Sequence, residues 1–284
     1  MSAEARLRHI VATGLDEGLS PPLLLMRLII AAEHETDVEA ALTADPRAGA
    51  PLRLWRERPG AWDVVRGVLD HADHAATAEA GDPVRRWAET FDRVASVSPE
   101  AAVALYSLGD AALLEAAGGE IVGWLDSRGL LDPATTVIDL GCGMGRVARL
   151  LAPRVDAVLG LDVSRRLLRH ARAVAQDAPN LLFALHAGRD LACVRDGAAD
   201  LVLAVDVMPY LVSAGLAAAH VADAFRALRP GGALVVMNWS YRGDPDLDLQ
   251  EAEAAAAAAG FTRGACVRPF SLWDGRVFHW ARPR

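Results

Sequence analysis

Five short apolar segments, each separated from the next by a stretch with helical spacing, constrain the fold of this chain most. They cover residues 135–140, 157–162, 181–186, 201–206 and 233–237. Strands that read as nearly continuous apolar runs are typical of a parallel sheet whose two faces are both covered by helices. The sequence therefore predicts an α/β fold that is built on five parallel strands.

Two further strands are expected after these five. Residues 262–270 and 276–281 read as an antiparallel hairpin joined by a short turn at Trp273-Asp274-Gly275. Before them, Asp248 is expected to cap a helix that runs through the alanine tract at 254–259 and stops at Gly260. Five parallel strands and a terminal hairpin make a seven-stranded mixed sheet.

The first third of the chain has a different sequence pattern, in which apolar residues recur at helical spacing and several helix-start signals occur. Ser20 precedes two prolines and an apolar run, and Pro59 opens a second helical pattern. We predict an N-terminal helical domain over residues 1–97, with a loop or hinge near 72–84, and a second domain over 98–284. The helical domain is expected to be either a lid that selects the substrate or a dimerisation element. Three of its residues form either core or a substrate cage: Trp55, Trp62 and Trp87.

Composition excludes several functions. All 29 basic residues are arginine, which excludes lysine nucleophiles, Schiff bases and the lysine of a phosphate loop. The net charge of −8 disfavours a nucleic-acid partner. No apolar run approaches the roughly 20 residues that span a bilayer. Three widely spaced cysteines do not form a disulfide framework. These observations predict a cytoplasmic protein with neither a nucleic-acid nor a membrane partner, and with a possible homodimer left open.

A glycine-rich loop follows the first strand, in the segment Asp139-Leu140-Gly141-Cys142-Gly143-Met144-Gly145. Glycines there permit positive φ angles and close approach of the backbone to a ligand. The spacing is G-x-G-x-G followed by Arg146, so the segment lacks the third glycine at the spacing of the dinucleotide fingerprint. A carboxylate at Asp139 would repel pyrophosphate but attract an ammonium group. Asp162, at the end of the second strand, is suited to accept hydrogen bonds from ribose hydroxyls. The plainer alternatives are a tight turn for the glycines and a helix cap for Asp162.

The stretch from about residue 136 to residue 239 resembles the class I S-adenosylmethionine-dependent methyltransferases. Five elements that occur in order carry this resemblance: Val137–Gly145, Leu161–Ser164, Gly188–Leu191, Asp200–Asp206 and Leu228–Gly232. The resemblance covers roughly residues 110–284 and implies a Rossmann-like form of the mixed sheet, with S-adenosylmethionine as cofactor. It does not explain the N-terminal helical domain.

The resemblance also implies roles for individual residues. Asp139 and the backbone of Gly141–Gly143 would hold the methionine moiety, Asp162 the ribose, and Asp190 the adenine amino group. Tyr106 would be an aromatic lid. The full set expected at the cofactor is Tyr106, Asp139, Gly141, Cys142, Gly143, Asp162, Val163, Arg189, Asp190, Leu191 and Asp206. Tyr106 and Tyr210 have ordinary packing as their alternative, and Cys142 is most simply a small residue behind the cofactor.

The acceptor is expected to be a small organic molecule with an apolar or aromatic body. The fourth strand is followed by Asp206-Val207-Met208-Pro209-Tyr210 and not by Asn-Pro-Pro-Tyr, which disfavours methylation of amide or nucleobase nitrogen of that type. Asp206, Tyr210 and Tyr241 are the candidates for a general base, with His186 and His279 less well placed. The residues predicted to bind the acceptor are Tyr210, Trp239, Tyr241 and Arg242, with Arg242 for a carboxylate.

Two other functions compete with this interpretation. A nicotinamide-dependent oxidoreductase would use a similar sheet, and a noncatalytic S-adenosylmethionine-binding module would use the same loop without turnover. A metal site is suggested by the spacing of Asp70, His71, Asp73 and His74. Histidines near a helix C-terminus are favourable without any metal, so no metal is predicted.

Overall fold

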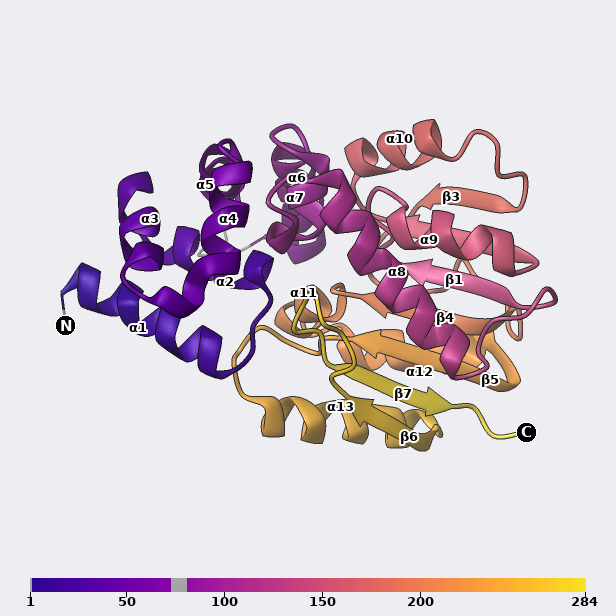
Figure 1. Ribbon diagram of the computed structural model, residues 1–284. Coiled ribbons are helices and arrows are strands. Elements are labelled where there is room, and N and C mark those ends of the chain that lie inside the picture. Colours follow the sequence, from indigo (N-terminus) through magenta and orange to yellow (C-terminus); the bar gives the residue numbers. More distant parts are fainter. Residues whose placement is uncertain (1, 73–80) are drawn as a thin grey trace. The chain divides into compact units, whose positions relative to one another are not determined.

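The computed structural model describes residues 2–72 and 81–284, which fall into two compact units that alternate along the chain (Figure 1). The helical unit contains Thr90–Ala117, Phe270–Asp274 and the described residues of Met1–Glu79. The sheet unit contains Gly118–Pro269, Gly275–Arg284 and the described residues of Ala80–Glu89. The division expected between residues 97 and 98 stays a prediction, and most of the loop expected at 72–84 lies outside the described residues.

The helical unit is built from short helices around an apolar core and a second, smaller apolar cluster. Ser20 caps the second helix as expected, because its hydroxyl accepts a hydrogen bond from the Leu23 N–H group. Trp55 is buried in the core, and Trp62 packs against it. The helices are α1 (Ala3–Asp16), α2 (Pro21–Ala31), α3 (Glu35–Thr43), α4 (Gly49–Glu57), α5 (Ala61–His71) and α7 (Pro99–Val103), with 3₁₀ turns η1 (Pro46–Ala48) and η2 (Leu105–Ser107). Two longer helices contribute residues to both units: α6 (Pro83–Val94) and α8 (Ala111–Ser127).

The sheet unit contains the expected seven-stranded mixed sheet. Its strands are β1 (Thr136–Leu140), β2 (Ala157–Asp162), β3 (Leu181–Leu185), β4 (Ala199–Val205), β5 (Leu228–Met237), β6 (Thr262–Val267) and β7 (Val277–Ala281). Their order is β3-β2-β1-β4-β5-β7-β6, with the first five strands parallel and β7 antiparallel to both of its neighbours. The Rossmann-like fold predicted from the sequence is confirmed. β5 begins at Leu228 and not at residue 233, because Leu228 pairs with Ala199 before a shift in register.

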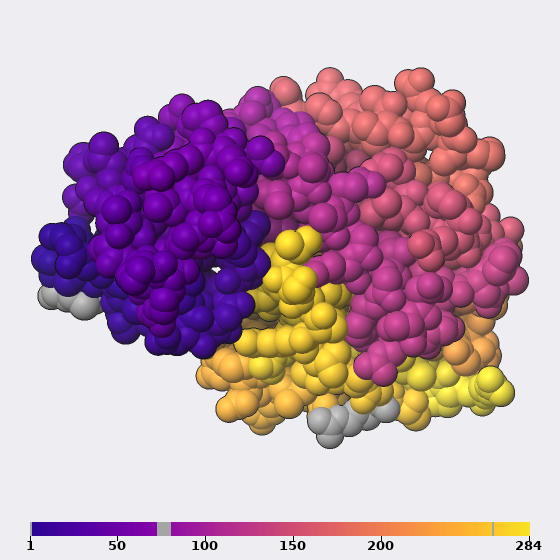
Figure 2. Space-filling model, viewed as in Figure 1, coloured from indigo at the N-terminus to yellow at the C-terminus, as the bar shows by residue number. Residues whose placement is uncertain are grey.

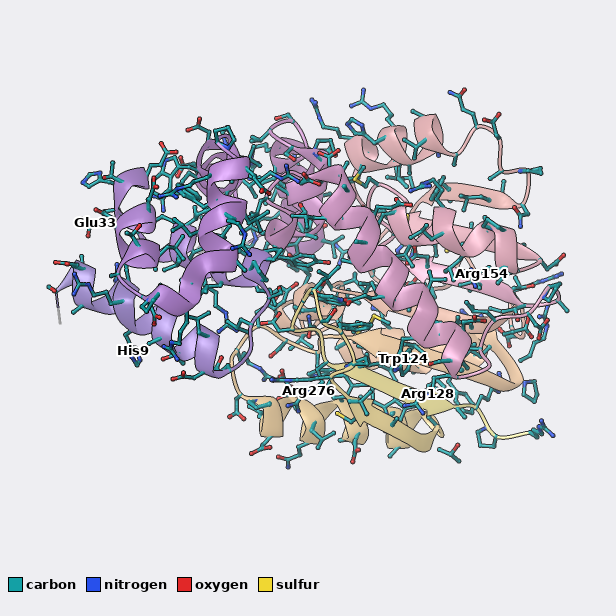
Figure 3. The ribbon with its side chains drawn as sticks, viewed as in Figure 1. His9, Glu33, Trp124, Arg128, Arg154 and Arg276 are labelled. Atoms are coloured by element: carbon teal, nitrogen blue, oxygen red, sulfur yellow. The ribbon has the colours of Figure 1, made fainter. Side chains whose placement is uncertain are left out.

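Helices that connect the parallel strands cover the sheet. They are α9 (Arg146–Leu151), α10 (Arg165–Val174), α11 (Met208–Ser213), α12 (Ala217–Ala227) and α13 (Pro245–Ala259), with a 3₁₀ turn η3 (Ala152–Arg154) after α9. α9 and α10 contact β2, whereas α12 contacts β5 and α13 contacts β6. Directly after α8, the guanidinium of Arg128 lies 5.4 Å from the centre of the Trp124 ring (Figure 3). The Trp124 ring also packs edge-on against His279 of β7.

Two expectations about the last part of the sheet unit are wrong. Asp244, and not Asp248, caps α13, because its carboxylate accepts from the Leu247 N–H group at 3.0 Å. The hairpin is not closed by a tight turn at Trp273-Asp274-Gly275, because β6 ends at Val267 and β7 begins at Val277. Residues Phe270–Asp274 of this long connection belong to the helical unit, where the Trp273 side chain is 3% exposed. Apolar burial therefore takes these residues out of the hairpin.

β3 forms one edge of the sheet and, with α10, lies at an outer edge of the sheet unit in Figures 1 and 2. Among the described residues, no helix combines the length and apolar character needed to cross a bilayer. In the same residues, no group of three or more histidine, cysteine, aspartate or glutamate side chains is arranged to hold a metal ion. Asp73 and His74 of the metal alternative lie outside the described part of the chain.

Candidate functional site

The glycine-rich loop leaves β1 with three left-handed residues. Gly141, Gly143 and Gly145 have φ angles of 71°, 56° and 77°. A Cβ atom on Gly141 would lie 2.6 Å from the Cβ atom of Val207, and one on Gly145 would lie 2.6 Å from the Phe183 ring. Both the backbone angles and the space around the loop therefore demand glycine, and Gly141 brings the loop directly against the segment after β4.

Asp139 is the most unusual group in this loop. Its side chain is 2% exposed, and its Oδ2 atom has no hydrogen-bond partner among the described residues. Burial raises the pKa of its carboxyl group to about 7; the nearby Arg146 guanidinium lowers this pKa and the Asp162 carboxylate raises it. A buried carboxylate oxygen without a partner is costly, and a cationic ligand would satisfy it.

Asp162 joins the end of β2 to the glycine loop. Its carboxylate accepts from the Gly143 N–H group at 2.8 Å and from the Ser164 N–H group at 2.7 Å. The N-cap of α10 is Ser164, whose hydroxyl accepts from the Leu167 N–H group. The alternative role of Asp162 as the helix cap is therefore filled by another residue. Asp162 holds the loop from within, and each of its oxygens can accept more than one hydrogen bond.

The segment after β3 approaches the end of β2. Gly188 has a φ angle of 71°, and a Cβ atom on it would lie 2.7 Å from a methyl group of Val163. The His186 Nδ1 atom lies 3.2 Å from the donating Gly188 N–H group, and Nε2 lies 2.5 Å from the Asp190 carbonyl oxygen, which assigns the proton to Nε2. Burial lowers the pKa of this imidazole. His186 therefore helps to shape this loop, and its role as a general base stays a prediction.

The other residues expected at the adenine also lie in this segment. Arg189 pairs with Asp82 at 2.5 Å, which gives the arginine a role that the sequence did not suggest. The Asp190 carboxylate accepts from the Ala192 N–H group at 3.0 Å, and the Leu191 side chain is fully buried. The structure thus brings the ends of β1, β2 and β3 together with residues of all three expected cofactor segments.

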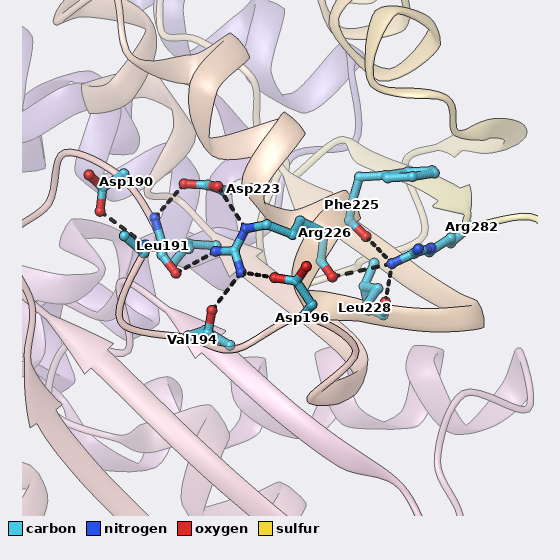
Figure 4. A network of polar contacts seen from close by, with 10 residues as sticks. Asp190, Leu191, Val194, Asp196, Asp223, Phe225, Arg226, Leu228 and Arg282 are labelled. Carbon is cyan, nitrogen blue, oxygen red and sulfur yellow. Dashed lines mark hydrogen bonds and ion pairs between the residues drawn. The ribbon is translucent and has the colours of Figure 1, made fainter.

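Arg226 of α12 holds the segment that follows Asp190, although the sequence offered no sign of this role (Figure 4). Its guanidinium donates to the carbonyl oxygens of Leu191 and Val194 at 2.9 and 2.7 Å, and to the carboxylate of Asp196 at 2.6 Å. Asp223, which accepts from Arg226, also accepts from the Leu191 N–H group at 2.8 Å. One side chain therefore ties several points of the loop to α12.

We expect Arg226→Lys to weaken cofactor binding by roughly tenfold, because an ammonium group cannot reproduce the planar, branched geometry of a guanidinium. Titration calorimetry with S-adenosylmethionine would measure the loss. Arg229→Lys is the matched control, since Arg229 pairs with Asp200 away from this loop. Equal affinity of Arg226→Lys and wild type would contradict the assigned role.

A second cluster lies after β4 and β5. The Tyr241 hydroxyl donates to the Asp206 Oδ1 atom at 3.2 Å. The Tyr210 ring packs edge-on against Tyr241 at 6.0 Å between centroids and against Trp87 at 4.8 Å. Burial, followed by the Asp206 carboxylate, raises the pKa of the Tyr210 phenol above its ordinary value. Tyr210 therefore stays protonated and acts as a donor or packing group, which leaves Asp206 as the stronger candidate for a base.

The remaining residues expected at the acceptor lie nearby but are engaged elsewhere. Trp239 is 3% exposed within the core of the sheet unit. The Arg242 guanidinium is held by Asp248 at 2.8 Å and by Glu251 at 2.7 Å, both on α13. An acceptor carboxylate would therefore have to compete with two protein carboxylates for Arg242.

The structure also places three aromatic residues and one cysteine that the sequence analysis named as candidates. Tyr106 is buried in the helical unit, where its ring stacks on Trp273 at 5.9 Å. Trp55 belongs to the core of that unit and Trp87 to the sheet unit, and the choice between core and a substrate cage stays a prediction. Burial, followed by the carboxylates of Asp139 and Asp162, raises the pKa of the Cys142 thiol. Cys142 is therefore a small buried residue and not an activated nucleophile.

Part of the sheet unit is similar to known methyltransferases. Residues 137–232 match the family model described as a methyltransferase domain. Over 120 residues the chain is 32% identical to a 2-methyl-6-phytyl-1,4-hydroquinone methyltransferase of Synechocystis, which covers 42% of this chain and 36% of that protein. Over 141 residues it is 32% identical to a trans-aconitate 2-methyltransferase of Azoarcus, which covers 49% and 53%.

A solved structure shows the same fold. The magnesium protoporphyrin IX methyltransferase from Synechocystis, solved with bound S-adenosylmethionine, has a TM-score of 0.57 and 19% identity, over 72% of this chain and 100% of that one. The chain spans about a third to a half of the length of the two curated relatives described above. These matches show that residues 137–232 of the sheet unit are similar to methyltransferase domains and that the chain shares the fold of a methyltransferase solved with S-adenosylmethionine, which supports the resemblance drawn from the motifs.

Proposed function

We propose that the whole protein is an S-adenosylmethionine-dependent methyltransferase that acts on a small organic acceptor. The observation that carries this proposal is the Asp139 carboxylate, which is buried with one oxygen lacking a partner among the described residues. It lies beneath a loop that admits only glycine at Gly141 and Gly145. A ligand with a cationic amino-acid end and ribose hydroxyls matches this carboxylate and the neighbouring Asp162.

The chemistry of the residues in the site suits this cofactor. Asp139 and the backbone from Gly141 to Gly143 would hold the amino-acid end, Asp162 the ribose, and the segment from Val163 through Leu191 the adenine. When bound, S-adenosylmethionine supplies an electrophilic methyl group on a cationic sulfur. The chain would contribute alignment of the acceptor, exclusion of water and, at Asp206, a carboxylate that can take a proton.

The names of the relatives guide the choice of acceptor. One is named for a hydroquinone and another for aconitate, so both chemical types are small organic molecules. The hydroxyl of a hydroquinone would meet the Asp206 carboxylate. The rings of Tyr210 and Tyr241 suit an aromatic acceptor. We therefore place a phenol-like acceptor ahead of a carboxylate, since Arg242 is already held by α13.

Two experiments test the proposal in sequence. Calorimetry with S-adenosylmethionine, its demethylated product and NAD tests the cofactor, and tight binding of NAD alone would reject the proposal. Transfer of a radiolabelled methyl group to a panel of hydroquinones, phenols and small carboxylic acids then tests catalysis. Binding of S-adenosylmethionine without turnover on any acceptor in the panel would favour the noncatalytic module.

Arg242 offers a direct test of how the acceptor is recognised. If Arg242 binds an acceptor carboxylate, Arg242→Ala should raise the acceptor KM by roughly 10- to 100-fold with little change in kcat, as loss of a charge-assisted hydrogen bond predicts. Glu251→Gln is the control, since it frees part of the guanidinium from α13 and should leave KM unchanged or lower it. Unchanged kinetics in Arg242→Ala with the true substrate would reject this role and leave the arginine as an anchor for α13.

The location and assembly of the protein stay predictions. A cytoplasmic location and a homodimer are both compatible with the sequence. Light scattering of the intact chain would measure its oligomeric state.

A further inference from the structure

The residues that directly follow β4 and β5 both have an unusual backbone conformation. Asp206, directly after β4, has a φ angle of 53°, and Asn238, directly after β5, has a φ angle of 61°. Asparagine and aspartate tolerate this left-handed region better than other residues with a side chain, but it is sparsely populated even for them. Such residues persist where surrounding contacts hold them, and they gather at functional sites.

The Asn238 side chain connects three strand ends. Its Nδ2 group donates to the Asp206 Oδ1 atom at 2.7 Å, and its Oδ1 atom accepts from the Arg276 N–H group at 2.9 Å. The backbone repeats the second connection, because the Asn238 N–H group donates to the Arg276 carbonyl oxygen at 2.8 Å. Asn238 thus ties the residue after β4 to the residue before β7, and both amide atoms are used.

The bond to Asp206 has a definite chemical consequence. A side-chain amide can donate only through its nitrogen, so the bond requires Asp206 to accept, as an ionised carboxylate does. Together with the Tyr241 hydroxyl, it directs two donors onto the same oxygen, Oδ1. Hydrogen bonds of this kind favour the charged form of a carboxylate and restrict its rotation.

We propose that Asn238 is a positioning residue that fixes the Asp206 carboxylate, in its ionised form, for action on the acceptor. This inference rests on the proposed function, in which Asp206 takes a proton from the acceptor. The two residues that flank Asn238, Met237 and Trp239, are buried in the core.

Two substitutions of Asn238 distinguish its hydrogen bond to Asp206 from its hydrogen bond to Arg276. Asn238→Gly removes both side-chain bonds but accepts a φ angle of 61° without strain, so it does not confuse loss of the amide with loss of the backbone conformation. Asn238→Asp keeps an acceptor for the Arg276 N–H group but replaces the donor to Asp206 with a second carboxylate. Both variants should lower kcat by about 10- to 100-fold, since small misplacement of a reacting group has effects of that size.

The expected signature distinguishes positioning from a general loss of structure. The Kd for S-adenosylmethionine and the acceptor KM should stay within roughly twofold of wild type. The acid limb of kcat against pH should move to higher pH in both variants, because one hydrogen bond to the charged form of Asp206 is lost. Asn238→Asp with wild-type kcat and pH profile would overturn the proposal, since the Arg276 bond alone would then suffice.

A crystal structure of Asn238→Gly provides a readout that does not depend on turnover. The proposal expects the Asp206 carboxylate to leave its place beside residue 238 or to occupy more than one rotamer. An unmoved, singly ordered Asp206 would overturn it. The failure of the proposed function would look different: wild type would transfer no methyl group to any acceptor, whereas the orientation of Asp206 in the variant would still change.

Discussion

Asp139→Asn should abolish measurable binding of S-adenosylmethionine and, at the same time, stabilise the cofactor-free protein at pH 8. Burial raises the pKa of the Asp139 carboxyl from 3.8 to about 7, so the folded protein holds this proton more tightly than the unfolded chain does. The contribution of this proton to the stability of the folded protein is complete below pH 4 and is lost as the pH rises toward 7. A pKa shift of this size corresponds to at most roughly 4 kcal/mol in the free energy of unfolding. Because asparagine cannot ionise, Asp139→Asn avoids this loss at high pH.

Thermal unfolding at pH 5 and pH 8 would measure this effect. The stabilisation of Asp139→Asn should be larger at pH 8, where the wild-type carboxyl is ionised. Calorimetry should also show that wild-type affinity for the cofactor falls as the pH drops below 7, because a cationic ligand favours the ionised carboxylate. Asp177→Asn, at an exposed position, is the control for both measurements. Equal stabilisation at the two pH values would show that Asp139 does not carry the buried charge.

Trp273→Ala should destabilise the helical unit by about 3–5 kcal/mol, the range for removing a buried large aromatic side chain. The Trp273 ring is 3% exposed and stacks on Phe270 at 4.9 Å and on Tyr106 at 5.9 Å. Nearby, the Ser20 hydroxyl donates to the Leu272 carbonyl oxygen at 2.8 Å, and Arg27 pairs with Asp274 at 3.1 Å. The connection between β6 and β7 is therefore bound into this unit by stacking, a hydrogen bond and an ion pair.

Trp273→Phe separates the ring stacking from the indole N–H group. That N–H group has no hydrogen-bond partner among the described residues, so phenylalanine should retain most of the stability. Chemical denaturation monitored by circular dichroism would compare the two variants. The assignment fails if alanine and phenylalanine cost the same.

The sequence predicted the parts of the site that are local in the chain. The carboxylate at Asp139 and the glycines that follow it lie within seven residues, and Asp162 marks the end of the next strand. The residues of each such segment are neighbours in the sequence, so the sequence alone predicts the three cofactor loops and the seven strands. The early start of β5 was missed because Arg229-Pro230-Gly231-Gly232 resembles a turn, whereas pairing at Leu228 and from Ala233 onward continues the ladder on both sides of it.

The missed residues act over long separations. Asn238 meets Asp206 across 32 residues, and Arg226 meets Leu191 across 35. No local periodicity links such pairs, although an asparagine directly after a buried strand is a known sign of a left-handed backbone. Asp248 was taken for a cap because it precedes the alanine tract, yet the earlier Asp244-Pro245 pair begins the helix.

The interleaving of the two units bears on how this protein is made by a ribosome. N-terminal domains commonly fold as they emerge, before the remainder of the polypeptide has been synthesised. Here the aromatic residues Phe270 and Trp273 complete the helical unit, and translation reaches them only after every strand except β7. The helical unit therefore gains its last residues only when nearly all of the sheet has left the exit tunnel.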